Sequence, residues 1–217
     1  MTKPVSAEKY IQTRARTLPI DRCLLSVDWE TERLAFALVI RKHSNGNFTF
    51  AGYWVDLLCL GIRDTFYEFN VSPEDLKGYL EANKEEIDMN EVDYGLVHNI
   101  IFAGYEFAAE FHIPQYPDFE KITQFLLEED SDNIPLIDIH TGDENGLPHL
   151  VVEPANLQTA VLAKLKQYAG EGNYRYSVVE DEPDEDDLEP YEPEWEEEED
   201  DAEDDGAQEP KDDAEKR

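Results

Sequence analysis

The chemically most suggestive residues of the chain are Asp56, Arg63 and Asp64, which close its most apolar stretch. Asp56 lies between two apolar residues, and an unpaired carboxylate in such surroundings is costly enough to need a partner or a proton. Arg63 or Asp64, close to the turn at Gly61, would lie beside it. A carboxylate held in this way can serve a small hydrolase or a ligand-binding domain. The alternative is structural: a buried ion pair, or a cap on the turn.

A second set, His98, Glu106 and Glu110, suggests a metal site on a helix. His98 and Glu106 are eight residues apart, more than two helical turns, and neither belongs to an HExxH or ExxH pair. We therefore interpret these residues as core or surface positions. The sequence predicts neither a metal nor a cofactor.

A third set, Asp138, His140, Asp143, Glu144 and Asn145, resembles a cation-binding loop. An EF-hand spreads its ligands over twelve residues between two helices and closes with a glutamate. The expected flanking elements here are strands, so the Gly-Asp-Glu-Asn-Gly segment is better explained as a turn.

Sequence motifs for nucleophilic catalysis and for nucleotide binding add no support for an enzyme. GxSxG, GxxxxGK[ST] and GxGxxG strings do not occur in the sequence. Residues 6–9, Ser-Ala-Glu-Lys, match SxxK, but no SDN or KTG string accompanies them, so the match is attributed to chance.

The element that must position Asp56 is the stretch Phe48–Phe66, FTFAGYWVDLLCLGIRDTF. It predicts a long central strand that runs into a tight turn at Gly61. The preceding Leu34–Lys42 reads as a strand, and Asn45-Gly46 favours a type I′ turn between them. We therefore expect Leu34–Lys42 to pair antiparallel with Phe48–Cys59.

Helix and strand signals along the rest of the chain complete an α+β domain. The predicted fold is an antiparallel sheet built from two hairpins and covered by three or four helices. The predicted helices are Ser72–Asn83, Asn90–His112, Asp118–Glu128 and Asn156–Tyr168, and residues 6–17 have only a thin apolar stripe for a further short helix. The remaining predicted strands are Ile20–Val27, the second hairpin Ile134–His140 with Leu147–Val152, and the edge strand Tyr174–Val179.

The net charge of −34 is unevenly distributed. Residues 180–217 contain 23 Asp or Glu against three Lys or Arg, a net charge of −20. Such a segment cannot bury enough apolar surface to offset its ordering entropy, so we expect residues 1–179 to form a single domain and 180–217 a disordered acidic tail.

Within this tail the large aromatic residues are Tyr191 and Trp195, and four glutamates follow Trp195 directly: Glu196, Glu197, Glu198 and Glu199. A polyanion with aromatic anchors is suited to holding a basic protein. It would shield a ribosomal or nucleic-acid-binding protein before assembly, in a chaperone-like manner, or compete with nucleic acid for it. Two alternatives stay open: a purely solubilising tail, and a tail that folds back on the basic segment Lys3–Arg22.

Composition also bears on the kind of partner and on the cellular compartment. The negative field disfavours direct contact with nucleic acid or with an anionic membrane. Cys23 and Cys59 lie in apolar runs and fit buried thiols of a reducing compartment. The first residues lack an apolar signal core, and apolar runs are too short to span a bilayer. The sequence therefore predicts a cytoplasmic protein.

Several stretches resemble an uncharacterised family of bacterial proteins with no assigned activity. These stretches are LPIDRCLLSVDW, RKHSNGNFTFAGYWVDLLCLGIRDTFYEFN, HNIIFAGYEFAAEF with the following PDF, and LIDIHTG, and VDLLCLGIRDTF is the most specific of them. The resemblance spans residues 18–142 and implies a shared domain fold. Some relatives carry a Cys-rich zinc-binding segment, in whose place this chain has its acidic tail.

Overall fold

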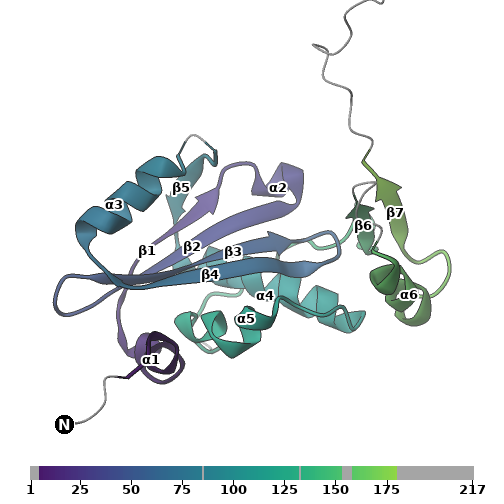
Figure 1. The fold of residues 1–217 in the computed structure, drawn as a ribbon. Coiled ribbons are helices and arrows are strands. Elements are labelled where there is room, and N and C mark those ends of the chain that lie inside the picture. Colours follow the sequence, from purple (N-terminus) through teal and green to yellow (C-terminus); the bar gives the residue numbers. More distant parts are fainter. Residues whose placement is uncertain (1–4, 85, 132, 153–157, 180–217) are drawn as a thin grey trace, which may run out of the picture. The chain divides into compact units, whose positions relative to one another are not determined.

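A computed structural model of the protein describes residues 5–84, 86–131, 133–152 and 158–179, all within one compact unit (Figure 1). Its main feature is a five-stranded antiparallel sheet with the strand order β4-β3-β2-β1-β5. The α+β class and the antiparallel sheet predicted from the sequence are confirmed. The strands are β1 (Ile20–Ser26), β2 (Leu34–Lys42), β3 (Phe48–Asp56), β4 (Gly61–Val71) and β5 (Met89–Val92).

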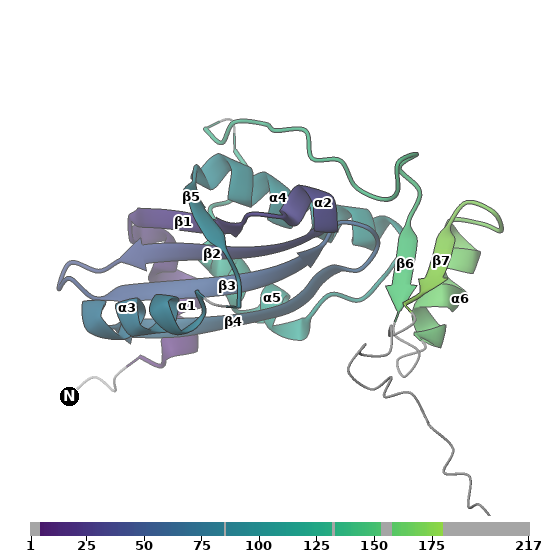
Figure 2. The ribbon, with the colours of Figure 1, turned by 90° about the horizontal axis from the view of Figure 1, so that it is seen from above.

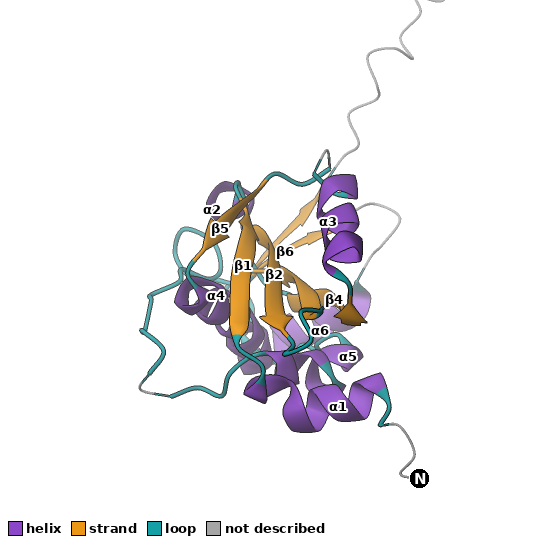
Figure 3. Cartoon of the chain, turned by 90° about the vertical axis from the view of Figure 1, so that its left-hand side faces the viewer, coloured by secondary structure: helices purple, strands orange, loops and turns teal. Residues whose placement is uncertain are grey.

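Helices cover both faces of this sheet (Figures 1 and 3). One face packs against α3, and the other against α1, α4, α5 and η2. Because both faces are buried, β2 and β3 are apolar along nearly their whole length instead of alternating. The helices are α1 (Ala7–Arg14), α2 (Trp29–Glu32), α3 (Pro73–Ala82), α4 (Tyr94–Glu110), α5 (Pro117–Lys121) and α6 (Thr159–Tyr168), with 3₁₀ turns η1 (Ala15–Thr17) and η2 (Thr123–Leu126).

The hairpin of β2 and β3 is confirmed, from Leu34 opposite Asp56 to Lys42 opposite Phe48. Its turn differs from the predicted type I′. Gly46 has a φ of 90°, but Asn45 does not share the positive φ that type I′ requires. Instead the Asn45 side chain accepts a hydrogen bond from the Asn47 N–H at 3.1 Å, which stabilises a longer loop.

The strand predicted within Phe48–Phe66 and the turn after it are present, but the turn comes before Gly61, and the stretch forms a second hairpin. β3 ends at Asp56, residues 57–60 form the turn, and Gly61 opens the edge strand β4 with a φ of 69°. Leu57, Cys59 and Leu60 are apolar because the turn is buried, although it is not extended. The middle strand of the sheet is β2, and β3 lies between β2 and β4.

Two helices begin or end elsewhere than predicted. In the predicted helix Asn90–His112, residues 90–92 belong instead to β5, which pairs with β1, and α4 begins at Tyr94. The predicted helix Asp118–Glu128 divides into α5 and η2. The predicted start of α3 is confirmed, with Ser72 as N-cap in a capping box with Asp75.

The second predicted hairpin is wrong. Residues 134–140 form no strand, and β6 (His149–Val152) pairs instead with β7 (Arg175–Val178) in a separate parallel sheet. A parallel pair needs a long crossover, which here includes α6. The predicted edge strand at Tyr174–Val179 is thus confirmed as β7, while the predicted start of the α6 helix at Asn156 lies outside the described residues.

Candidate functional site

Asp56, the residue that the sequence singles out, caps the turn between β3 and β4. Its Oδ1 accepts hydrogen bonds from the N–H groups of Leu58, Cys59 and Leu60, at 2.9, 2.8 and 3.3 Å. The backbone donors that the turn leaves unpaired are therefore satisfied by one carboxylate oxygen. The structural interpretation of Asp56 as a cap on the turn matches this geometry.

The pKa of Asp56 is raised above 3.8, chiefly because burial disfavours the charged carboxylate. The hydrogen bonds from the turn and the charge of Arg63 act in the opposite direction. A raised pKa is common to catalytic and structural carboxylates, so the surroundings must distinguish the two.

A cavity of about 420 Å³ lies beside Asp56 and is also lined by Arg63 and Arg33. Arg33 already donates to the carbonyl of His140 at 2.5 Å. Asp64 does not line this cavity; it is exposed, and its Oδ1 accepts from the Thr65 N–H at 2.7 Å. The structure therefore brings Asp56 and Arg63 together without Asp64. Glu32 also lines the cavity, so two carboxylates and two guanidinium groups lie around it. Because the Asp56 carboxylate is already engaged by the turn, the guanidinium groups suit binding of an anionic ligand better than the carboxylates suit catalysis as a paired acid and base.

His98 and Glu106 line another cavity, of about 840 Å³, whereas Glu110 does not line it. His98 is buried on α4, with 3% of its surface exposed. Among the residues that the structure describes, no cluster of three or more His, Cys, Asp and Glu side chains is arranged to hold a metal ion.

The loop around Asp143 is held as a turn. Asp143 Oδ1 accepts from the N–H groups of Asn145 and Leu147, and its Oδ2 accepts from Arg175 Nε at 2.5 Å. The hydrogen bond from Arg175, together with those from the backbone, lowers the pKa of Asp143 to about 2. The Asp143 carboxylate thus links this loop to Arg175 of β7. Asp138 is exposed outside this turn.

The Ser6–Lys9 match to SxxK is explained by helix capping. Ser6 Oγ accepts a hydrogen bond from the Lys9 N–H at 3.3 Å, as the N-cap of α1.

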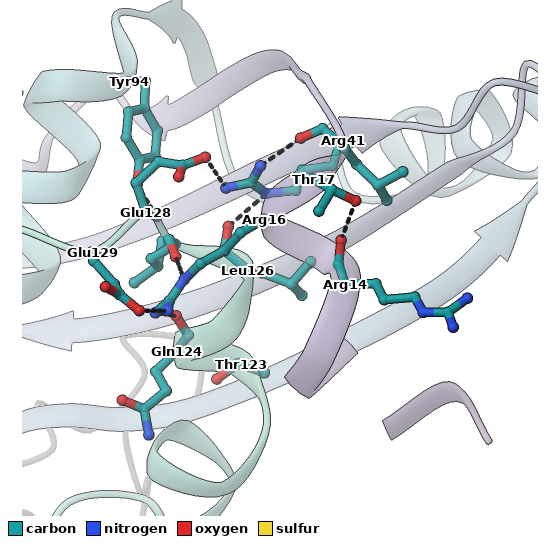
Figure 4. Close-up of polar contacts among 12 residues, drawn as sticks. Arg14, Arg16, Thr17, Arg41, Tyr94, Thr123, Gln124, Leu126, Glu128 and Glu129 are labelled. Atoms are coloured by element: carbon teal, nitrogen blue, oxygen red, sulfur yellow. Dashed lines mark hydrogen bonds and ion pairs between the residues drawn. The ribbon is translucent and has the colours of Figure 1, made fainter. Parts of the chain in front are cut away.

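A buried charge that the sequence analysis missed lies at Arg41, in β2 (Figure 4). Its side chain is fully buried and donates to the carbonyls of Leu126 and Leu18, at 2.8 and 2.6 Å, and to Glu128 Oε1 at 2.7 Å. The sequence contains a signal for it, because Arg41 directly follows the apolar run LAFALVI, as Asp56 follows the next apolar run. Arg41 therefore links β2 to Leu18, just before β1, and to the segment that contains Leu126 and Glu128.

The residues predicted to bind a basic partner, Tyr191, Trp195 and Glu196–Glu199, lie outside the described residues.

Comparisons with protein-family models, with curated proteins and with solved structures find no match to this chain. The resemblance to an uncharacterised bacterial family therefore stays a prediction. No helix within the described part of the chain is long and apolar enough to cross a membrane.

Proposed function

We propose that the protein is a non-catalytic cytoplasmic binding module whose segment 180–217 engages a basic protein. The observation that carries this proposal is the charge of that segment, −20 over 38 residues, with Tyr191 and Trp195 set within it. Charge of this density accelerates and strengthens encounters with a basic surface, and aromatic side chains supply the anchoring contact area. Ribosomal and nucleic-acid-binding proteins have the matching charge.

The folded domain supports the proposal indirectly. Two of the carboxylates that the sequence analysis considered for chemistry have structural partners: Asp56 caps a turn, and Asp143 pairs with Arg175. These groups are therefore occupied in maintaining the fold.

Affinity purification from cell extract, followed by mass spectrometry, tests the proposal. Deletion of residues 180–217 should remove basic proteins from the captured set. With the full chain, raising the salt from about 0.1 M to about 0.5 M should weaken capture by about tenfold or more, because screening shortens the range of the attraction. An unchanged captured set after deletion would contradict the proposal.

The double substitution Tyr191→Ala and Trp195→Ala serves as the matched control, since it keeps the whole charge of the segment. Under the proposal it reduces affinity while the salt dependence persists. A radius of gyration that increases with salt, together with no captured protein, would instead indicate that the segment folds back onto Lys3–Arg22.

A small hydrolase or ligand-binding domain at Asp56 is the second candidate, favoured by the cavity that Asp56 shares with Arg63. Binding of a small carboxylate or phosphate ligand there would raise the melting temperature of the protein. The substitution Arg63→Ala should remove that rise, and Asp64→Ala should not. A melting temperature that such ligands leave unchanged would exclude this candidate.

A further inference from the structure

The strand β7 has a hydrogen-bonding partner on one side only. It pairs with β6, which lies beside it (Figure 2), and within the described part of the chain no strand pairs with its other edge. The N–H groups of Arg175 and Val179, at the two ends of β7, donate to carbonyls at the ends of β6, at 2.8 and 2.9 Å. Because the backbone groups of a strand point to its two sides alternately, those of Tyr176 and Val178 face the open edge.

Apolar side chains at this edge are incompletely covered. Leu150 and Val152 of β6 are buried in one cluster with Leu165 of α6. Tyr176 and Val178 lie opposite Leu150 and Val152 in the register, so their side chains are on the same face of the sheet. Tyr176 is nevertheless 38% exposed and Val178 41%. The apolar layer next to α6 therefore continues to the edge of β7 and stays partly open there.

The open edge of β7 also lacks the usual protection. Native proteins guard an edge strand with charged side chains, with proline or with a covering segment. The sequence of β7, Arg-Tyr-Ser-Val, has no proline, and its one charged residue, Arg175, pairs with Asp143 at 2.5 Å. An unprotected edge with exposed apolar side chains beside it is a template for a further strand.

The charge of the sequence after β7 indicates which strand would pair there. Seven of residues 180–187, EDEPDEDD, are Asp or Glu. A segment that pairs with β7 has its flanking residues within reach of these carboxylates, so Lys and Arg at those flanking positions are favoured. A second copy of this chain would bring a second acidic segment of the same charge, and repulsion disfavours that pairing.

We infer that the open edge of β7 binds an extended segment of the basic protein partner as a third strand. Main-chain hydrogen bonds to Tyr176 and Val178 hold this segment, and its apolar side chains cover theirs. The added strand runs antiparallel to β7, the commoner and slightly more stable pairing, so its Lys and Arg residues precede the paired part and lie beside residues 180–187. The inference rests on the proposed function, since it names the way in which the basic protein docks.

Two blocked peptides, titrated into the full-length protein and followed by NMR of the backbone amides, test the inference. The first is Lys-Arg-Lys-Lys-Val-Thr-Val-Thr-Val, and the second replaces the last five residues by Gly-Ser-Gly-Ser-Gly. With the first, the N–H groups of Tyr176 and Val178 should exchange more slowly with solvent, whereas that of Val179, already bonded to Val152, should change less. The second should bind about tenfold more weakly and give no such protection, since it lacks the apolar side chains.

The peptide results separate this inference from the proposed function. Equal affinities for the two peptides, without protection of Tyr176 and Val178, would overturn the docking on β7 and leave binding by segment 180–217 in place. Binding of neither peptide would contradict both. Deletion of residues 180–217 should weaken the first peptide and keep the protection at saturation. Stronger binding after the deletion would mean that this segment itself covers the edge, and the inference would fail.

Substitution of Val178 tests the hydrogen bonds of the edge. Val178→Pro removes an N–H that faces away from β6, a position where edge strands tolerate proline, and should weaken the first peptide by about tenfold. Val178→Thr is the matched control, because it keeps the N–H and the branched side chain, and it should change the affinity less than about threefold.

A change on the peptide side keeps the test independent of the folding of the Val178→Pro variant. Methylation of the three valine amide nitrogens of the first peptide removes its donors without altering the protein, and should weaken binding as much as Val178→Pro does. The inference would be overturned if the methylated peptide bound as tightly as its parent. It would also be overturned if sedimentation showed a dimer of the full chain that Val178→Pro dissociates, because the edge would then belong to a second copy.

Discussion

Arg41 and His98 are both buried polar side chains next to the residues that follow η2, yet their surroundings differ. Arg41 donates to two carbonyls and to Glu128, so all its hydrogen bonds end within the protein. His98 lies near this cluster, and Tyr94 contacts both. The Tyr94 hydroxyl accepts a hydrogen bond from the Glu128 N–H at 2.6 Å, and the centre of its ring lies 5.6 Å from that of His98. Among the residues that the structure describes, the Nε2 atom of His98 has no such partner.

This difference separates two uses of a buried polar group. A group whose partners all lie within the fold stabilises the fold, and its removal leaves those partners unpaired. A buried group without a partner instead carries a desolvation cost that no hydrogen bond offsets. Asp56 belongs with Arg41, since its Oδ1 has three backbone donors.

The largest effect is expected for Arg41→Met. The substitution leaves the carbonyls of Leu126 and Leu18 unpaired in the interior and removes the partner of Glu128, whose side chain is 38% exposed. The free energy of unfolding should therefore fall by about 3–5 kcal/mol, chiefly from the two carbonyls. Urea denaturation measures this change. Arg16→Met is the matched control, because Arg16 pairs with the exposed Glu129 and donates to the Leu127 carbonyl at 2.7 Å (Figure 4), so its loss should cost about 1–2 kcal/mol, less than that of Arg41. Equal losses for the two variants would contradict the assignment of Arg41 as the main connection.

A smaller effect is expected for Asp56→Ala. The change removes the acceptor of three backbone N–H groups and should lower the free energy of unfolding by about 2 kcal/mol. Asp56→Asn keeps an acceptor oxygen at the same place and should cost less than about 1 kcal/mol.

Asp64→Ala is the control for this series, because Asp64 is exposed, and it should stay within about 0.5 kcal/mol of the wild type. Should Asp56→Ala prove as harmless as Asp64→Ala, the carboxylate would not be a cap, and a functional role would have to explain it.

The sequence predicts those parts of the fold that short-range signals determine. Asn45-Gly46 and the Ser72–Asp75 capping pattern are local, so the first hairpin and α3 were placed correctly. β4 and β5 were missed because each is an edge strand with many exposed residues and so lacks a strong apolar pattern. The parallel pairing of β6 with β7 depends on residues 26 apart in the chain, which local patterns do not reveal.

The candidate site shows the same limit. An apolar neighbourhood correctly indicates that Asp56 needs a partner, but the partner is the backbone of the turn, and backbone N–H groups are the same in every sequence. His98 was noticed for its spacing from Glu106, while its lack of a partner depends on how the segment at 130–139 lies against α4. That arrangement is tertiary, and helical periodicity contains no information about it.

The smallest expected effect is a difference in pH dependence between the wild type and His98→Phe. Burial lowers the pKa of His98 below 6.5, against the opposing influence of the Glu128 backbone and of the charges of Asp130 and Glu128. As the pH falls below 6.5, the unfolded chain therefore binds a proton that the folded chain does not, and the folded state loses stability. His98→Phe lacks this loss, so the variant should gain stability relative to the wild type as the pH decreases from 7. His43 also has a lowered pKa, but it is present in both proteins and cancels in the comparison. Urea denaturation of both proteins at a series of pH values measures the difference. A difference that does not vary with pH would mean that the ring is protonated equally in both states, and His98 would then resemble Arg41 in having its charge compensated within the protein.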